Sequence, residues 1–277
     1  MTLGETLRSA RSLLIDRHIE DAPFEGELLL RRAMGISRAS LFTNLEADIE
    51  PGQEKEFWNM VNRRIDGEPL NYITGSREFY GLDFIVTPDV LIPRPETELL
   101  VDRALATARE QSAPVIADIG TGSGCIAISL AVNLPCARIF AVDISKRALK
   151  IARVNCKKHG AENKISFVQG DLLQPLSGPF DIIVANLPYV KASDIPSPCR
   201  EPFEALDGGE DGLGQVRCLL PQAPGKLKNG GYLLLEIGQG QGGEVSRISK
   251  TFFPLAVLEI FSDLAGIDRV VSVTTNT

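Results

Sequence analysis

Four consecutive residues combine side chains and a backbone suited to holding a planar amino group: Asn186, Leu187, Pro188 and Tyr189. They follow the apolar run 181–185, which predicts a buried strand that breaks into a loop. Asn186 supplies a carbonyl acceptor, Pro188 biases the preceding backbone toward an extended form, and Tyr189 offers a stacking surface. A strand that merely ends needs only Gly, Asp or Ser, so this tetrapeptide is a candidate site for chemistry on an NH2 group.

A glycine-rich segment follows another apolar run and opens a predicted helix that extends to about residue 131. Glycines at every second position let the backbone approach a ligand closely. A dinucleotide fingerprint needs a third glycine at position 125, which is Cys125, so the shorter spacing favours a nucleoside without a pyrophosphate. The residues that we expect to bind this cofactor are Asp118, Gly120, Thr121, Gly122, Ser123 and Gly124.

Two further acidic residues end the next predicted strands. Asp143 can accept both hydroxyls of a ribose, or it can cap the helix that starts near Ser145. Asp171 can accept the exocyclic amine of an adenine while Leu172 packs beside the ring. Because open α/β sheets bind ligands at the carboxyl ends of their strands, these residues and Asn186 predict one shared cofactor site.

The pattern that must position these residues is an alternation of strand-like and helix-like segments. The strand-like segments are residues 115–119, 138–143, 165–168, 181–185, 232–237, 257–261 and 270–274. They predict an α/β fold with a doubly wound, seven-stranded, mostly parallel sheet. Only residues 262–268 separate the last two, so we expect these to pair antiparallel at one edge.

The beginning of the chain follows a different pattern. Apolar residues recur at helical spacing to about residue 67, and Thr2 with Glu5 predicts a capping box, while Asp21 can cap the second helix. Alternation broken by Gly and Pro follows and suggests a hairpin. The expected organisation is a small helical domain at 1–72, a β-hairpin connector at 73–95 and the α/β domain at 96–277.

Composition limits the classes of function. The chain has 277 residues, 44% hydrophobic, which is ample for a buried core. Its 29 basic and 36 acidic residues give a net charge of −7, so we expect no stable binding to nucleic acid. No apolar run approaches membrane-spanning length, and the first residues lack the apolar core of a signal peptide. Five cysteines without C-x-x-C spacing predict neither disulfides nor a metal site, as in a reduced cytoplasmic protein.

Several further segments extend these motifs over nearly the whole chain: 68–73, Gly75, 78–81, 91–98, 201–206, Gly212, Leu213, 236–238 and Gln241. With them the chain resembles Rossmann-like S-adenosyl-L-methionine-dependent methyltransferases, and more narrowly the release-factor glutamine methyltransferases of the HemK or PrmC family. The resemblance implies methylation of the side-chain amide nitrogen of the glutamine in the Gly-Gly-Gln loop of peptide chain release factors. It also implies that 1–72 recognises the substrate and 96–277 is the methyltransferase domain of a cytoplasmic enzyme, which we expect to be a monomer.

The resemblance gives Asn186, Pro188 and Tyr189 catalytic roles, and it makes all four residues of the tetrapeptide, Leu187 included, part of the substrate site. Asn186 is also expected beside the cofactor. The Asn186 side-chain oxygen and the Leu187 carbonyl are expected to accept the two N–H bonds of the amide, which aims its nitrogen at the sulfonium methyl group. The family usually has Pro where this chain has Leu187, and enzymes that methylate adenine amines in ribosomal RNA also carry Leu there.

Two other functions remain open on the sequence. The first is methylation of an exocyclic amino group of an adenine or cytosine, against which the acidity of the chain argues. The second is a non-catalytic, cofactor-binding adaptor, against which intact Asn186 and Tyr189 argue. The loop 201–213 either borders the substrate channel or is a solvated crossover, and Arg94 and Glu96 act either in capping or near the ligand.

Overall fold

The computed structural model describes residues 1–109 and 111–276, which divide into two compact units, Met1–Gly75 and Ser76–Thr277. Within these described ranges no helix has both the length and the apolar character needed to cross a membrane.

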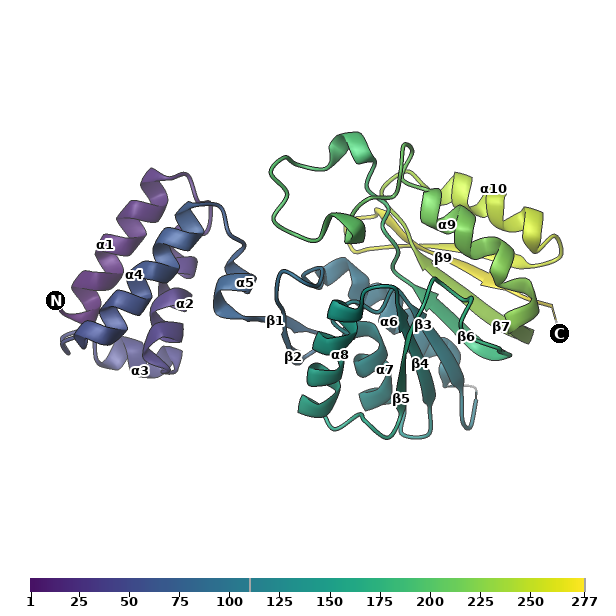
Figure 1. Ribbon diagram of the computed structural model, residues 1–277, viewed down its shortest axis with the longest axis horizontal. Helices are drawn as coiled ribbons and strands as arrows, with labels where there is room; N and C mark the ends of the chain where they lie inside the picture. The colour runs from purple at the N-terminus through teal and green to yellow at the C-terminus, as the bar shows by residue number, and fades with distance from the viewer. Residues whose placement is uncertain (110, 277) are drawn as a thin grey trace. The chain divides into compact units, whose positions relative to one another are not determined.

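The first unit is entirely helical (Figure 1). Its helices are α1 (Leu3–Asp16), α2 (Ala22–Met34), α3 (Arg38–Thr43), α4 (Pro51–Ile65) and α5 (Leu70–Thr74). The predicted capping box is present, because Thr2 Oγ1 accepts from the Glu5 amide at 3.2 Å and Glu5 Oε2 accepts from the Thr2 amide at 2.9 Å. The predicted side-chain cap by Asp21 was wrong. Its backbone, at φ −96° and ψ 30°, lacks the extended form that turns an N-cap side chain toward the first amides.

The second unit begins with a β-hairpin of β1 (Ser76–Phe79) and β2 (Leu82–Ile85), and continues as an α/β fold. Its large sheet contains β3 (Val115–Ile119), β4 (Arg138–Asp143), β5 (Ile165–Gln169), β6 (Phe180–Ala185), β7 (Leu227–Glu236), β8 (Val257–Ser262) and β9 (Asp268–Thr274). Its helices are α6 (Glu98–Ala108), α7 (Cys125–Asn133), α8 (Lys146–Lys158), α9 (Gly214–Leu219) and α10 (Gly242–Phe252). Short 3-10 turns are η1 (Pro95–Thr97), η2 (Ala192–Asp194), η3 (Phe203–Ala205), η4 (Leu220–Gln222) and η5 (Pro224–Lys226).

The strand order is β5-β4-β3-β6-β7-β9-β8, with the first five strands parallel and β9 antiparallel to both of its neighbours. The predicted fold class and the antiparallel pair at one edge are therefore confirmed. Strand β7 starts five residues before the predicted start at residue 232. Its pairing with β6 is interrupted by a bulge that holds Asn229, Gly230 and Gly231, which read as a turn in the sequence.

Both faces of the large sheet are buried, as side-chain alternation requires. Ile116 and Ile182 pack with α6, α7 and the hairpin on one face, while Ala117 and Ile183 pack with α9 and α10 on the other (Figure 1). Strands β4 and β5 are added on one side of β3, whereas β6 and the strands after it are added on the other side. The strand order therefore reverses between β3 and β6. A ligand site is expected at this switch point.

Asn155 on α8 joins three parts of the second unit and is completely buried. Its Oδ1 accepts from the Ile85 amide at 2.7 Å, and its Nδ2 donates to the Ile85 and Ser123 carbonyls, both at 2.9 Å. The side chain therefore fastens the β1–β2 hairpin and the glycine-rich loop to α8.

Replacing Asn155 with Ala is expected to lower the free energy of unfolding by about 3 kcal/mol, because it leaves buried backbone groups unpaired. Urea titration followed by circular dichroism measures this loss. The control, Asn163→Ala, alters an exposed side chain and should change stability by less than about 0.5 kcal/mol. Equal stability of the two variants would contradict the assigned role.

Candidate active site

The carboxyl ends of the parallel strands lie level with one another. Ile119 at the end of β3 pairs with Val142 of β4 and with Ala185 of β6, and Ala185 pairs with Leu235 of β7. The loops that follow β3 and β6 therefore start side by side at the switch point. The segments that the sequence analysis singled out occupy this edge of the sheet.

The glycine-rich loop and the tetrapeptide are in contact. Gly120 has φ +74°, and a Cβ atom added there would lie 3.3 Å from Leu187 Cδ2 and 3.4 Å from the Asn186 carbonyl oxygen. A left-handed backbone and this close approach both favour glycine. Gly120 is itself exposed, so the loop presents bare backbone beside the tetrapeptide.

Asp118 is fully buried at the base of the glycine-rich loop. Its Oδ2 accepts from Thr121 Oγ1 at 2.6 Å and from the Ala127 amide at 3.2 Å, whereas its Oδ1 has no partner among the described residues. Burial raises the pKa of Asp118 to about 7, against the opposing effect of the Thr121 and Ala127 hydrogen bonds. A buried oxygen without a partner is the kind of group that a bound donor can satisfy.

Asp143 holds the neighbouring backbone with both of its oxygens. Oδ2 accepts from the Gly122 amide and Oδ1 from the Ser145 amide, each at 2.8 Å. Ser145 itself caps α8 by accepting from the Ala148 amide at 3.2 Å. Burial raises the pKa of Asp143, while the two amide hydrogen bonds lower it. Each carboxylate oxygen has a second lone pair, so Asp143 can accept further hydrogen bonds while it orders the loop.

Asp171 and Leu172 follow β5 with different exposures. The Asp171 side chain is exposed and accepts from Gln174 Nε2 at 2.7 Å. Leu172 is 7% exposed and has φ +48°, an uncommon backbone conformation for a branched residue. The structure thus places an acidic and an apolar side chain next to each other at this strand end.

The tetrapeptide is tied to two residues whose chemistry the sequence analysis did not assign. Asn186 Nδ2 donates to Thr97 Oγ1 at 3.0 Å, and the Tyr189 hydroxyl donates to Glu236 Oε1 at 3.3 Å. Thr97 is 1% exposed and Glu236 is 3% exposed. Burial and the negative charge of Glu236 raise the pKa of Tyr189 to about 12, so its hydroxyl remains a donor at neutral pH.

Glu236 ends β7 as a buried carboxyl group. Burial raises its pKa to about 7, although hydrogen bonding from Thr97 and Tyr189 and the charge of Arg269 oppose this shift. Its Oε2 has no hydrogen-bond partner within the part of the chain that the structure describes. Its place at a strand end is the signal that could have revealed it, because Asp143 has the same relation to β4.

Comparison with known proteins agrees with this arrangement. Residues 5–75 match the family model of the PrmC N-terminal domain, and residues 95–259 match the methyltransferase small domain. A release factor glutamine methyltransferase from Moorella thermoacetica is 43% identical over 274 residues, which cover 97% of each chain. One from Geobacter sulfurreducens is 41% identical over 279 residues, which cover 98% of this chain and 95% of the relative. The chain belongs to the release factor glutamine methyltransferase family.

The family resemblance inferred from the motifs is thereby confirmed, and the chain is a methyltransferase. Among solved structures, a methyltransferase from Pyrococcus furiosus superposes with a TM-score of 0.53, over 72% of this chain and 91% of that one. Its sequence identity is 17%, so it supports the shared fold alone.

In this family member, a glutamine holds the last residue of the tetrapeptide in place. Gln241 Nε2 donates to the Tyr189 carbonyl at 3.1 Å and to the Gly212 carbonyl at 3.4 Å, while Gln241 Oε1 accepts from the Gly238 amide at 2.8 Å. A Cβ atom on Gly238 would lie 3.2 Å from Tyr189 Cδ2. The Tyr189 ring therefore packs on the backbone that follows β7.

The loop 201–213 is attached to the same region. Glu201 Oε1 accepts from the Ile92 amide at 3.1 Å, and Glu201 Oε2 forms an ion pair with Arg94. The Gly208 amide donates to the Val190 carbonyl at 2.8 Å. A crossover loop surrounded by solvent would lack these contacts. The loop 201–213 therefore forms a border of the candidate site.

The two buried acids predict a specific dependence of stability on pH. A carboxyl group whose folded pKa is raised contributes stability that is complete below its unfolded pKa and is lost as pH rises through the folded value. The pH range over which Asp118 and Glu236 lose this contribution to stability therefore extends from about pH 4 to about pH 7. We expect Asp118→Asn to reduce the fall in unfolding free energy between about pH 5 and pH 8 by on the order of 2 kcal/mol.

Chemical denaturation across this pH range measures the effect in Asp118→Asn. The exposed Asp211, whose pKa Arg217 lowers to about 2, titrates below this window, so Asp211→Asn should leave the slope unchanged. An equal slope in the wild type and Asp118→Asn would contradict the raised pKa of Asp118.

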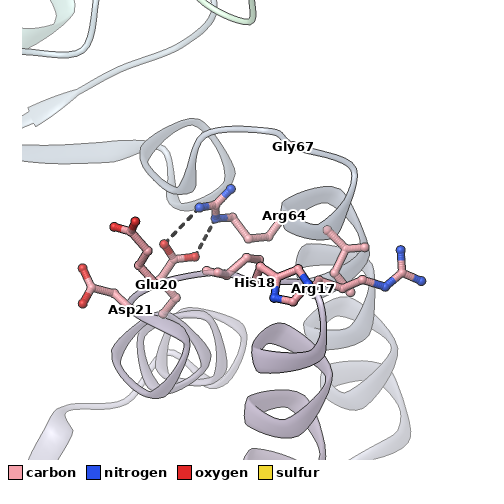
Figure 2. Close-up of a pocket in the computed structure, with 9 residues that line it drawn as sticks. Arg17, His18, Glu20, Asp21, Arg64 and Gly67 are labelled. Carbon is pink, nitrogen blue, oxygen red and sulfur yellow. Dashed lines mark hydrogen bonds and ion pairs between the residues drawn. The ribbon is translucent and has the colours of Figure 1, made fainter.

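A separate pocket of about 460 Å³ lies in the helical unit (Figure 2). Its lining includes Arg17, His18, Glu20, Asp21, Glu25 and Arg64. Arg64 and Glu25 form a double contact, with Nε to Oε2 at 2.5 Å and Nη2 to Oε1 at 3.1 Å. These two charges neutralise each other, so the pocket offers no unpaired charge from this pair to a ligand.

Proposed function

We propose that the protein transfers the methyl group of S-adenosyl-L-methionine to the side-chain amide nitrogen of the glutamine in the Gly-Gly-Gln loop of a peptide chain release factor. The observation that carries this proposal is the close approach of the glycine-rich loop to the tetrapeptide, where Leu187 and the Asn186 carbonyl lie within 3.4 Å of a Cβ atom added at Gly120. It brings the expected cofactor site and the expected amide site together at the switch point of the sheet.

The residues present fit the methyl donor. Any side chain at position 120 would fill the space beside its exposed backbone, which glycine leaves open to a ligand. The unpartnered Asp118 Oδ1 can accept a hydrogen bond from an amino group of the methyl donor. Asp143 has lone pairs for the ribose hydroxyls, and Asp171 with Leu172 offers an acceptor and an apolar surface for the adenine. Thr121, Gly122, Ser123 and Gly124 complete this proposed binding set. When bound, S-adenosyl-L-methionine supplies a methyl group on a positively charged sulfur.

The chain has to orient an amide nitrogen, which is a poor nucleophile because its lone pair is delocalised. Asn186 donates through Nδ2 to Thr97, which leaves Oδ1 as an acceptor for one N–H bond of the substrate. The Leu187 carbonyl accepts the other, and Pro188 restrains that part of the backbone. Such positioning contributes up to about 7 to 11 kcal/mol to lowering a reaction barrier.

Tyr189 and the surrounding backbone form the wall of the site. The Tyr189 ring, held by Glu236 and packed on Gly238, provides a fixed surface for the glutamine side chain. No general base has to remove a proton beforehand, since the N–H bond becomes acidic only as the new C–N bond forms. The Asn186 Oδ1 and the Leu187 carbonyl hold the two N–H bonds until one proton leaves to solvent.

The helical unit is proposed to recognise the release factor, because it precedes the methyltransferase domain as a compact fold of its own. We infer further that the enzyme acts as a monomer in the cytoplasm on a protein substrate. Leu187 in place of the usual Pro buries its side chain against the glycine-rich loop, where 5% of its surface is exposed.

Mass spectrometry of a purified release factor after incubation with the enzyme and labelled methyl donor tests this function. One added methyl group on the glutamine of the Gly-Gly-Gln loop is expected, and a release factor with Ala in place of that glutamine should gain none. A parallel incubation with ribosomal RNA tests methylation of bases. Label in the RNA alone would replace the proposed function, and label in neither despite cofactor binding would favour an adaptor.

A further inference from the structure

The side chain of Asn186 has two chemically opposite ends. The oxygen end accepts hydrogen bonds and the NH2 end donates them. A substrate NH2 group needs acceptors, so only the orientation with Oδ1 toward the substrate can hold it. The reverse orientation would set two donors against each other.

Thr97 contacts the NH2 end of the Asn186 side chain, with 3.0 Å between Asn186 Nδ2 and Thr97 Oγ1. A hydroxyl group can accept or donate, so this contact alone does not select the orientation. Although Thr97 precedes α6, its side chain does not cap that helix. The destination of the single hydroxyl proton of Thr97 therefore decides which end of Asn186 faces outward.

Glu236 is the acceptor available to this proton. Tyr189 donates to its Oε1 at 3.3 Å, and its buried Oε2 has no partner among the described residues. An ionised carboxylate can only accept, and hydrogen bonding from Thr97 favours the charged form of Glu236. With its proton directed to Glu236, Thr97 is left with lone pairs, and the only matching partner on Asn186 is Nδ2. We propose that Thr97 and Glu236 are positioning residues that hold the Asn186 side chain with its oxygen toward the substrate nitrogen.

This inference rests on the proposed function and adds to it the residues that set the polarity of the substrate site. It also explains why a carboxyl group is kept at the buried end of β7, where 3% of Glu236 is exposed. A protonated Glu236 could donate to Thr97, and Thr97 could then donate to an inverted Asn186.

The charged and titratable groups around Glu236 come from four parts of the second unit. Glu96 on η1 disfavours its charged form, Arg269 on β9 favours it, and Tyr189 after β6 donates to it. The thiol of Cys125 on α7 stays neutral, because burial first and also the charge of Glu236 raise its pKa to about 12. The maximal rate at saturating cofactor should therefore fall as pH decreases below about 7, when Glu236 takes up a proton.

The experiment compares the wild type with Thr97→Val, Thr97→Ser and Glu236→Gln. Thr97→Val keeps the side-chain shape and should lower kcat by at least about tenfold, with cofactor affinity changed by less than about twofold. Thr97→Ser restores the hydroxyl and should recover most of the rate. Glu236→Gln should lower kcat and abolish its fall at acidic pH. The control, Thr6→Val, alters a fully buried threonine hydroxyl in α1 that has no partner among the described residues, and should keep the wild-type rate.

A second measurement reads the orientation without substrate. In nuclear magnetic resonance spectra, the two side-chain N–H protons of Asn186 should differ strongly in chemical shift, since one is bonded to Thr97. The difference should shrink on acidification and in Thr97→Val at every pH. It should persist in Thr6→Val.

The outcomes separate this inference from the proposed function. If the wild-type enzyme leaves the release factor unmethylated, the proposed function is wrong. The spectra of Asn186 then still show which end of its side chain faces Thr97. An active wild type with unchanged kcat in Thr97→Val overturns the inference alone. If Thr97→Val does not fold, an acidic fall in rate that persists in Glu236→Gln, or spectra of Asn186 indifferent to pH, overturns it.

Discussion

Replacing Asn186 with alanine is expected to lower kcat for methyl transfer by at least about a thousandfold, because the substrate nitrogen loses one of its two acceptors and its alignment. Cofactor affinity should change by less than about tenfold, since most of the proposed cofactor contacts come from the glycine-rich loop and from the acids at the carboxyl ends of β3 and β4. Single-turnover assays give the rate, and calorimetric titration with the cofactor gives the affinity separately.

Asn186→Asp is the matched control for this prediction. Aspartate keeps an acceptor of the same shape toward the substrate, and Thr97 can turn its single hydroxyl proton from Glu236 to the second oxygen of the aspartate. Asn186→Asp should therefore retain at least about ten times the activity of Asn186→Ala. Equal rates in the two variants, or a wild-type rate in Asn186→Ala, would show that this side chain does not hold the substrate.

The strand-end residues were predictable because their position follows from local patterns. Hydrophobic runs locate the strands, and parallel strands bring their carboxyl ends to one edge, so Asp118, Asp143 and Asn186 could be grouped without coordinates. The same reasoning gave the doubly wound sheet and its antiparallel edge pair.

The contacts that support those residues could not be obtained in this way. Thr97 lies 89 positions from Asn186, and Asn155 lies 70 positions from Ile85, so nothing in local spacing connects them. Threonine before a helix reads as a cap, although this one is not. The early start of β7 was hidden by a bulge whose glycines look like a turn. Long-range polar pairing is specified by the completed fold rather than by periodicity.

Gly212→Ala is expected to lower kcat by about a hundredfold, because this loop position tolerates no side chain. A Cβ atom at Gly212 would lie 2.3 Å from the Tyr189 carbonyl oxygen and 2.7 Å from Gln241 Nε2. Backbone must therefore move, and the backbone that moves carries Tyr189, which we propose lines the substrate site. The displacement should also break the Gln241 clamp on the Tyr189 carbonyl.

Gly209 provides a control for backbone strain. It has φ +84° against +78° at Gly212, but a Cβ atom there would have nothing within 4 Å. Gly209→Ala should therefore cost only the left-handed strain, about 1 to 2 kcal/mol of unfolding free energy, with little change in kcat. Thermal melts and kcat measured on both variants separate the two effects. If Gly209→Ala and Gly212→Ala lose the same activity, conformational strain alone explains the loss. A larger loss in Gly212→Ala assigns it to the displaced Tyr189 segment, which would make the loop after η3 part of the machinery that aligns the substrate.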